Sequence, residues 1–278
     1  MTVLNNHSVP VHLPYLLYDS DSVPYPYTPS APFALTDAFI EYAGKTSQGI
    51  LHFWKTDPLV ILGMMDTKLP AFDSALSVIR QSDYALVVRN SGGLAVVSDP
   101  GILNVSLIFP EEEQRMTINE GYQRMHALIA ESFQEYGKTI DAVEIPDSYC
   151  PGDYDLSIDG KKIAGISQRR IKGGIAIMIY LSVSGNQLER GQLIQDFYQK
   201  GDAHEQDRWH FPDVRPSSMT TLEAAFETSL SVRQVKYKLE QTLRNWGAEL
   251  TTGTYSEDIH MAYQAGMKKM KKRNEKLL

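Results

Sequence analysis

The only cysteine of the chain, Cys150, is the first residue whose type and setting could do chemistry. It lies in the turn-rich stretch DSYCPGD and not inside an apolar run, and loops of this kind often present catalytic groups. A thiol becomes a nucleophile when a neighbouring cation raises its thiolate fraction. The alternative is that Cys150 is a small, buried and inert side chain, as most lone cysteines are.

A hairpin downstream of Cys150 supplies the candidate cation. Two strand-like stretches, YDLSI and KKIAGI, are separated by Asp159-Gly160, which is the strongest short turn signal. A two-residue turn places Lys162 opposite Ser157 on the polar face of the hairpin, and Lys161 is left in an awkward or edge position. We therefore expect Lys162 to be the lysine that acts with Cys150.

The length of chain between Cys150 and Lys162 limits whether the two side chains can act together. If the chain between Cys150 and Ser157 were extended, the cysteine and Lys162 would lie roughly 23 Å apart at about 3.3 Å per residue. The pair can act together only if Pro151-Gly152 folds the loop back over the sheet. The sequence permits such a fold and does not require it.

A glycine-rich segment, RNSGGLAVVSDPGILN, begins at Arg89. Its Gly92-Gly93 pair separates two apolar, strand-like runs, where glycine lets the backbone approach a ligand and present amides to an oxyanion or a phosphate. The spacing fits neither a P-loop nor a dinucleotide fingerprint. A β-bulge or a sharp turn between strands is the structural alternative.

Other kinds of site are excluded or unsupported. One cysteine cannot form an internal disulfide or a zinc site built from thiolates. The seven histidines are scattered without metal-ligand spacing. The basic cluster Lys161, Lys162, Arg169, Arg170 and Lys172 could steer acidic partners, or it could protect a strand edge by charge.

Composition places the chain among ordinary globular proteins. Of its 278 residues, 42% are apolar and 22% are charged, which excludes a disordered chain. No run of 18 apolar residues and no secretory signal is present, so we expect a cytoplasmic protein without a membrane span. The net charge is −7, although residues 261–278 alone carry +5, and an acidic body argues against nucleic-acid binding.

Periodicity predicts one α+β domain with a helical C-terminal portion. Proline spacing makes residues 1–32 an extended arm on the surface, and residues 33–250 form the catalytic domain. A basic helix is expected in 251–278. The remaining predictions are helices over 36–44, 118–136 and 232–246, and strands over 49–56, 58–65, 85–110 and 173–183.

Two of these segments resemble the signatures of the lipoate–protein ligase and octanoyltransferase family. RNSGGLAVVSDPGILN resembles R-x-x-G-G-G-A-V-x-H-D-x-G-x-L-N, and DLSIDGKKIAGISQRR resembles the strand–turn–strand signature that ends G-[KR]-K-I-[AS]-G-x-[AS]-Q. The resemblance covers roughly residues 45–230. It implies a biotin/lipoate protein ligase-like catalytic domain related to class II aminoacyl-tRNA synthetases, with mixed or antiparallel sheets flanked by helices.

Within the family, the chain is most similar to the octanoyl-[glycine cleavage H protein]:protein N-octanoyltransferases. Their nucleophilic cysteine stands where Cys150 stands, and the family lysine aligns with Lys162. The resemblance implies that the Gly92 and Gly93 amides stabilise an oxyanion and that Leu94, Val96 and Ile163 line an acyl tunnel. The residues expected to bind substrate are Arg89, Ser91, Gly92, Gly93, Leu94, Ser157, Gly165 and Gln168.

The sequence departs from the ligase pattern at two positions. Leu94 replaces the third glycine and Ser98 replaces the histidine. The bulky Leu94 argues against nucleotide binding and a cysteine nucleophile makes an acyl-adenylate unnecessary, so together they favour a transferase over an ATP-dependent ligase. The implied reaction moves an octanoyl group from octanoylated glycine cleavage H protein to apo lipoyl domains of 2-oxoacid dehydrogenase E2 subunits, with neither ATP nor a metal. The alternatives are transfer from octanoyl-acyl carrier protein, an ATP-dependent lipoate ligase and a non-catalytic module that binds acyl-protein.

Overall fold

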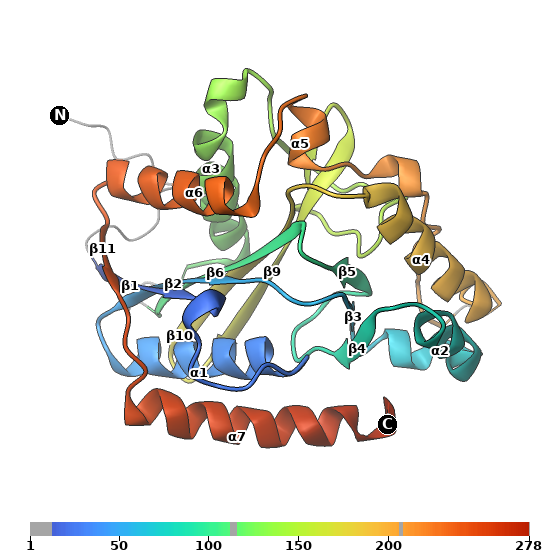
Figure 1. Ribbon diagram of the computed structural model, residues 1–278, viewed down its shortest axis with the longest axis horizontal. Coiled ribbons are helices and arrows are strands. Elements are labelled where there is room, and N and C mark those ends of the chain that lie inside the picture. The colour runs from blue at the N-terminus through green and yellow to red at the C-terminus, as the bar shows by residue number, and fades with distance from the viewer. Residues whose placement is uncertain (1–12, 112–115, 206–207, 278) are drawn as a thin grey trace.

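The computed structural model describes residues 13–111, 116–205 and 208–277 (Figure 1). In these residues helices surround a large mixed sheet and a small sheet, which confirms the predicted α+β class. The large sheet has the spatial order β11 (Glu249–Thr252), β1 (Pro14–Asp19), β2 (Gly49–Trp54), β6 (Ile102–Pro110), β10 (Gly174–Ser182), β9 (Lys161–Ile171), β8 (Leu156–Ile158), β7 (Asp141–Ala142). The small sheet has the order β4 (Ala85–Val88), β3 (Leu59–Leu62), β5 (Val96–Ser98).

The helices cover both faces of the large sheet and one side of the small one (Figure 1). Their bounds are α1 (Ala31–Lys45), α2 (Phe72–Arg80), α3 (Ile118–Ser132), α4 (Gln187–Lys200), α5 (Leu222–Ala225), α6 (Val232–Asn245) and α7 (Glu257–Asn274). Short 3₁₀ turns cover Ser20–Ser22, Asp66–Lys68, Gln134–Tyr136, Pro216–Ser218 and Glu275–Leu277. No helix of the described residues is long and apolar enough to cross a membrane.

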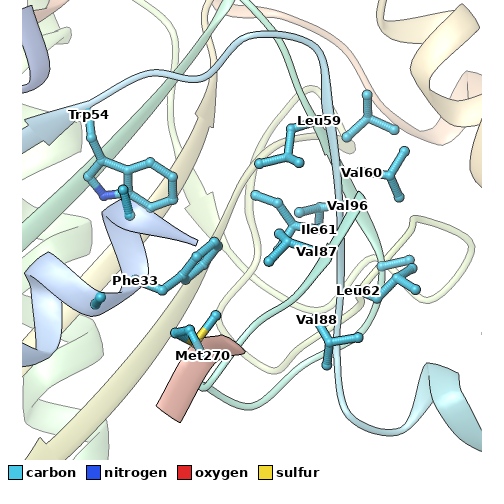
Figure 2. Packing of buried hydrophobic residues seen from close by; sticks show 14 of the residues in the cluster. Phe33, Trp54, Leu59, Val60, Ile61, Leu62, Val87, Val88, Val96 and Met270 are labelled. Atoms are coloured by element: carbon cyan, nitrogen blue, oxygen red, sulfur yellow. The ribbon is translucent and has the colours of Figure 1, made fainter. Parts of the chain in front are cut away.

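Two hydrophobic cores lie on opposite faces of the large sheet. One core joins α1, α7 and the small sheet, and Figure 2 shows part of it, with Met270 of α7 near Phe33 of α1 and Trp54 of β2. The other core lies under α3 and α6. The space between the two sheets borders the first core, so the walls of any site there are fixed by packing.

The N-terminal segment differs from the predicted arm. Pro14–Asp19 form β1 inside the large sheet, between β2 and β11, with Tyr15 and Tyr18 buried. Proline excludes a helix but is tolerated as the first residue of a strand, which is where Pro14 stands. Residues 1–12 lie outside the described residues. The predicted boundary at 250 falls within β11, so it does not separate two units.

The first helix also begins earlier than predicted. α1 starts at Ala31 because Pro32 occupies its first turn, where a missing N–H removes no helical hydrogen bond. Gly44 was expected to end the helix in a left-handed conformation, and instead the helix continues to Lys45. Glycine is required at position 44 for another reason, since a Cβ there would lie 2.3 Å from the carbonyl oxygen of Lys172.

Most other predicted elements are confirmed. The helix predicted over 118–136 is α-helical only to Ser132, and a 3₁₀ turn over Gln134–Tyr136 then leads to Gly137 at φ 67°. α6 is followed by Gly247 at φ 100°. Ser256 caps α7 by accepting a hydrogen bond from the backbone N–H of Ile259. The long apolar stretch over 85–110, however, divides into three strands, and these strands belong to both sheets.

The predicted hairpin has the expected turn and pairing. Asp159 and Gly160 adopt φ 50° and 74°, as a two-residue turn of this type requires, and Ser157 pairs with Lys162. The register then shifts, so that Leu156 pairs with Ala164. The shift is a β-bulge, which the sequence did not indicate and which changes the faces on which the next side chains lie.

Candidate active site

A cavity of about 290 Å³ opens between the two sheets. It is bounded by the start of α1, by strands β2, β3, β5, β9 and β10, and by the segments around Gly92 and Cys150. Eight of the ten residues predicted for the site line it, and they are Cys150, Lys162, Arg89, Ser91, Gly92, Gly93, Gly165 and Gln168. Leu94 and Ser157 are not among the lining residues, although the backbone of Leu94 takes part in the site.

The thiol of Cys150 lies among hydrogen-bond donors. Its Sγ is 3.1 Å from the backbone N of Leu94 and 3.4 Å from Nη2 of Arg89. Cys150 itself has φ 48°, a backbone conformation that non-glycine residues adopt at an energetic cost and that clusters at functional sites. These donors hold the half-buried thiol at the cavity, where it can act as a nucleophile.

Lys162 does reach the cysteine loop, but it contacts the backbone and not the thiol. Its Nζ donates to the carbonyl oxygens of Cys150 at 2.8 Å and Tyr149 at 3.0 Å, and to Oγ of Ser148 at 3.1 Å. It also forms a buried ion pair with Oδ1 of Asp155 at 2.8 Å. Burial raises the pKa of Asp155, and the ammonium of Lys162 opposes that rise.

These contacts change the roles that were predicted for Lys162 and Arg89. The loop folds back over the sheet as the pairing required, and Lys162 is the residue that holds it there. The cation beside the sulfur is Arg89, which we expected to bind substrate. The backbone amide directed at the sulfur is that of Leu94, and the role of the Gly92 and Gly93 amides in stabilising an oxyanion stays a prediction.

Gly93 explains why the loop needs glycine. It adopts φ 97°, and a Cβ there would lie 2.0 Å from Nη2 of Arg89 and 2.9 Å from Sγ of Cys150. Any side chain at this position would displace both groups. The loop is also held from outside by Asp37, which accepts a hydrogen bond from the Asn90 amide at 2.9 Å and pairs with Arg169 at 2.5 Å.

The inner part of the cavity is apolar. Phe33, Trp54, Ile61, Val96 and Met178 line it, and the rings of Phe33 and Trp54 pack edge to face with centroids 5.5 Å apart (Figure 2). Of the three residues predicted for an acyl tunnel, only Val96 is in the lining.

The other two tunnel residues lie elsewhere for identifiable reasons. Ile163 is next to Lys162, so strand alternation turns it to the opposite face, where it packs into the second core. Leu94 contributes its amide to the site, and its side chain packs against the first core. Sequence reasoning missed Phe33 and Trp54 because apolar runs give no sign of which member faces a cavity.

The predicted basic cluster is not a free positive surface. Arg169 pairs with Asp37, Lys172 pairs with Glu41, and Arg170 donates to the carbonyl oxygens of Met116 and Thr117. β8 pairs only with Lys161, Lys162 and Ala164 of β9, so Arg169 and Arg170 lie where no described strand pairs with the outer edge of β9. Gln168 is tied to α3, where its amide donates to the carbonyl oxygen of Ile118 at 2.5 Å.

Comparison with known proteins supports the same assignment of fold. The chain resembles a bipartite lipoate protein ligase from Thermoplasma acidophilum, with a TM-score of 0.68, 18% identity and coverage of 93% of both chains. It also resembles lipoate-protein ligase A bound with ATP, with a TM-score of 0.69, 18% identity and coverage of 92% of this chain and 94% of that one. At such identity these likenesses show the fold alone.

Sequence relatives are much closer. An octanoyl-[GcvH]:protein N-octanoyltransferase of Geobacillus kaustophilus is 44% identical over 88% of this chain and 87% of its own length. A lipoyl-[GcvH]:protein N-lipoyltransferase of Listeria monocytogenes is 39% identical over 88% of this chain and 89% of its own length. Residues 28–244 match the lipoyl protein ligase A/B catalytic domain, and with relatives this similar over most of its length the chain belongs to that family.

Proposed function

We propose that this chain is an octanoyl-[glycine cleavage H protein]:protein N-octanoyltransferase that works through a thioester on Cys150. The acyl donor is the octanoylated H protein (GcvH), and the acceptors are apo lipoyl domains of 2-oxoacid dehydrogenase E2 subunits. The observation that carries the proposal is a cysteine at an apolar cavity with Sγ 3.1 Å from a backbone N–H and 3.4 Å from a guanidinium. The names of the relatives support the donor.

The chemistry balances without a cofactor. The Cys150 sulfur attacks the amide carbonyl of the octanoyl-lysine, the C–S bond forms, the C–N bond breaks, and the thiol proton passes to the departing lysine amine. A neutral lysine amine of the acceptor then attacks the thioester, and the thiol is regenerated. One amide is exchanged for another, so the reaction needs neither ATP nor a metal.

The described residues divide this work among themselves. The Leu94 N–H and Arg89 contact the Cys150 sulfur and fix its position, while Lys162 holds the loop that carries Cys150. Phe33, Trp54, Ile61 and their neighbours receive the octanoyl tail. Burial of its seven apolar carbons contributes roughly 5 kcal/mol at about 0.8 kcal/mol per methylene.

The first test is intact-mass analysis of the wild type and of Cys150→Ser after mixing with octanoylated H protein in the absence of ATP. We expect an octanoyl adduct on the wild type alone, and its disappearance with transfer when an apo E2 lipoyl domain is added. Absence of both adduct and transfer would overturn the proposal. Parallel samples with octanoyl-acyl carrier protein, and with ATP plus octanoate, identify the sister transferase and the ligase.

A lipoyl group is the second candidate for the transferred acyl chain. The Listeria relative, named for lipoyl transfer from GcvH, is nearly as similar to this chain as those named for octanoyl transfer. Competition between octanoylated and lipoylated H protein for Cys150 separates the two. A larger kcat/KM for the lipoyl donor would assign the chain to lipoyl transfer.

The proposed chemistry also favours a compartment. A nucleophilic thiol stays reduced in the cytoplasm, where disulfides are rare, and we place the enzyme there. Fractionation of cells that express the protein at its natural level would test this placement, with recovery in the cytosolic fraction as the expected result.

A further inference from the structure

A carboxylic acid and a tyrosine are buried behind the reactive thiol without lining the cavity. Asp66 follows β3 and is fully buried, and Tyr198 comes from α4 and is 2% exposed. They are 132 residues apart in the sequence, and the hydroxyl of Tyr198 donates to Oδ1 of Asp66 at 2.8 Å. Burial of a carboxylate costs free energy unless hydrogen bonds compensate for it, so the donors around Asp66 identify what it holds in place.

The hydrogen bonds of this pair lead to the backbone beside Cys150. The Gly63 N–H donates to Oδ2 of Asp66 at 2.7 Å, and the Ala95 N–H donates to the hydroxyl oxygen of Tyr198 at 3.3 Å. Ala95 directly follows Leu94, whose own N–H reaches Sγ of Cys150. Two consecutive amides are therefore fixed, one on the sulfur and the next on the buried tyrosine.

The direction of these hydrogen bonds is set by the chemistry of the groups. The Ala95 amide can only donate, so the Tyr198 oxygen accepts from it and the tyrosine proton goes to Asp66. Asp66 accepts on both carboxyl oxygens, from Tyr198 on Oδ1 and from Gly63 on Oδ2. Burial raises the pKa of Asp66 to about 6, against the hydrogen bonds of Tyr198 and Gly63 and the charge of Arg89, so the carboxylate is ionised at neutral pH.

We propose that Asp66 and Tyr198 are positioning residues for acyl transfer, which hold the backbone at Ala95 so that the Leu94 N–H stays directed at the Cys150 sulfur. The inference rests on the proposed role of Cys150 as the nucleophile. Asp66 also holds Gly63, whose N–H donates to its carboxylate. Gly63 in turn packs against the glycine loop, since a Cβ on Gly63 would lie 1.8 Å from the carbonyl oxygen of Gly93. The pair thus supports both sides of the glycine loop.

The variant Tyr198→Phe tests this role, because it keeps the ring and removes only the hydroxyl. Thiol reactivity is measured by the rate of alkylation with iodoacetamide at pH 7, which needs no acyl donor. Acylation by octanoylated H protein is measured in a single turnover, and affinity for that donor is measured in the Cys150→Ser background. Tyr18→Phe is the matched control, because Tyr18 is a buried tyrosine that donates to the Thr254 carbonyl oxygen at 2.8 Å, away from the cavity.

Tyr198→Phe should slow both alkylation and acylation about tenfold, which is the effect of one lost buried hydrogen bond, while donor affinity and melting temperature match those of the control. Asp66→Asn, which has the same shape and no charge, should also slow both alkylation and acylation. Rates within twofold of the wild type in both variants would overturn the inference, as would a slowing explained by lost affinity or lost folded protein. If the wild type alkylates rapidly and forms no octanoyl adduct, the proposed function fails while the positioning role is still tested by alkylation.

Discussion

At the scale of single residues, Gly93 is the position where the site is most sensitive to one added carbon. Gly93→Ala places a Cβ 2.0 Å from the Arg89 guanidinium and puts alanine at φ 97°. We expect the rate of Cys150 acylation to fall at least a hundredfold, because both groups around the sulfur must move, and stability to fall by about 1–2 kcal/mol from the backbone strain.

Gly137→Ala separates these two effects. Gly137 has φ 67° and no atom within 4 Å of a Cβ added there, so only the backbone strain applies. It should lose similar stability in urea unfolding and keep its full acylation rate. If Gly93→Ala and Gly137→Ala are acylated at equal rates, the space around the Cys150 thiol does not control the rate of acylation.

Lys162 gives a second prediction at this scale. Lys162→Met leaves Asp155 as an unpaired buried charge and removes the donor to three oxygens of the cysteine loop. Unfolding free energy should fall by about 3–5 kcal/mol, which is usual for breaking a buried ion pair. Lys161→Met, at the exposed neighbouring position, should change it by less than about 0.5 kcal/mol in the same urea titration. A small loss at Lys162 would mean that the ion pair does not hold the loop.

The site residues show what sequence reasoning can and cannot reach. Cys150 and Lys162 were identified from loop context and hairpin register, because both are local properties. The partner of the sulfur was misassigned, since Arg89 meets Cys150 across 61 residues and no local pattern encodes that contact. Asp66 and Tyr198 gave no signal at all, because an isolated acid and an isolated tyrosine in apolar text look like ordinary surface and core residues.

At the scale of elements, the end of α7 closes the free edge of the small sheet. The Asn274 side chain accepts from the Val88 N–H at 2.7 Å and donates to the Val88 carbonyl oxygen at 3.2 Å, and Val88 precedes Arg89. Asn274→Ala should cost about 1–2 kcal/mol and raise the hydrogen-exchange rate of the Val88 amide at least tenfold. Arg273→Ala, one residue earlier and exposed, should leave that amide protected. Unchanged protection in Asn274→Ala would show that the edge is closed by other contacts.

An element could be predicted from the sequence when the residues that determine it are close together in the chain. The turn at Asp159-Gly160 was predicted because a few adjacent residues decide it. β1 was missed because its strand character comes from pairing with β2 and β11, and β11 is more than 200 residues away. The bulge between Lys162 and Ala164, which turns Ala164 to the face of the second core beside Ile163, is likewise decided by packing and not by local propensity.

At the scale of the whole molecule, two buried titratable groups make opposite contributions to stability as the pH falls. Burial under α1, with a smaller contribution from the charge of Lys236, lowers the pKa of His52 to about 3. The unfolded chain then binds more protons than the folded one between about pH 6.5 and 3, so acid destabilises the fold by about 1.4 kcal/mol per pH unit. Asp66, whose pKa is raised to about 6, binds its proton first in the folded state, so its contribution to stability increases as the pH falls from 6 towards 4.

These two contributions nearly cancel between about pH 6 and 4, and replacing one group should reveal the other. His52→Leu removes the histidine, both of whose ring nitrogens lack partners in the described residues. Its stability relative to the wild type should therefore increase by about 1.4 kcal/mol for each pH unit below 6.5, measured by urea unfolding at pH 4, 5, 6 and 7. All other titrations are common to both proteins and drop out of the difference. A difference that stays constant with pH would mean that His52 titrates normally in the fold, and that the face of the large sheet under α1 is open to water.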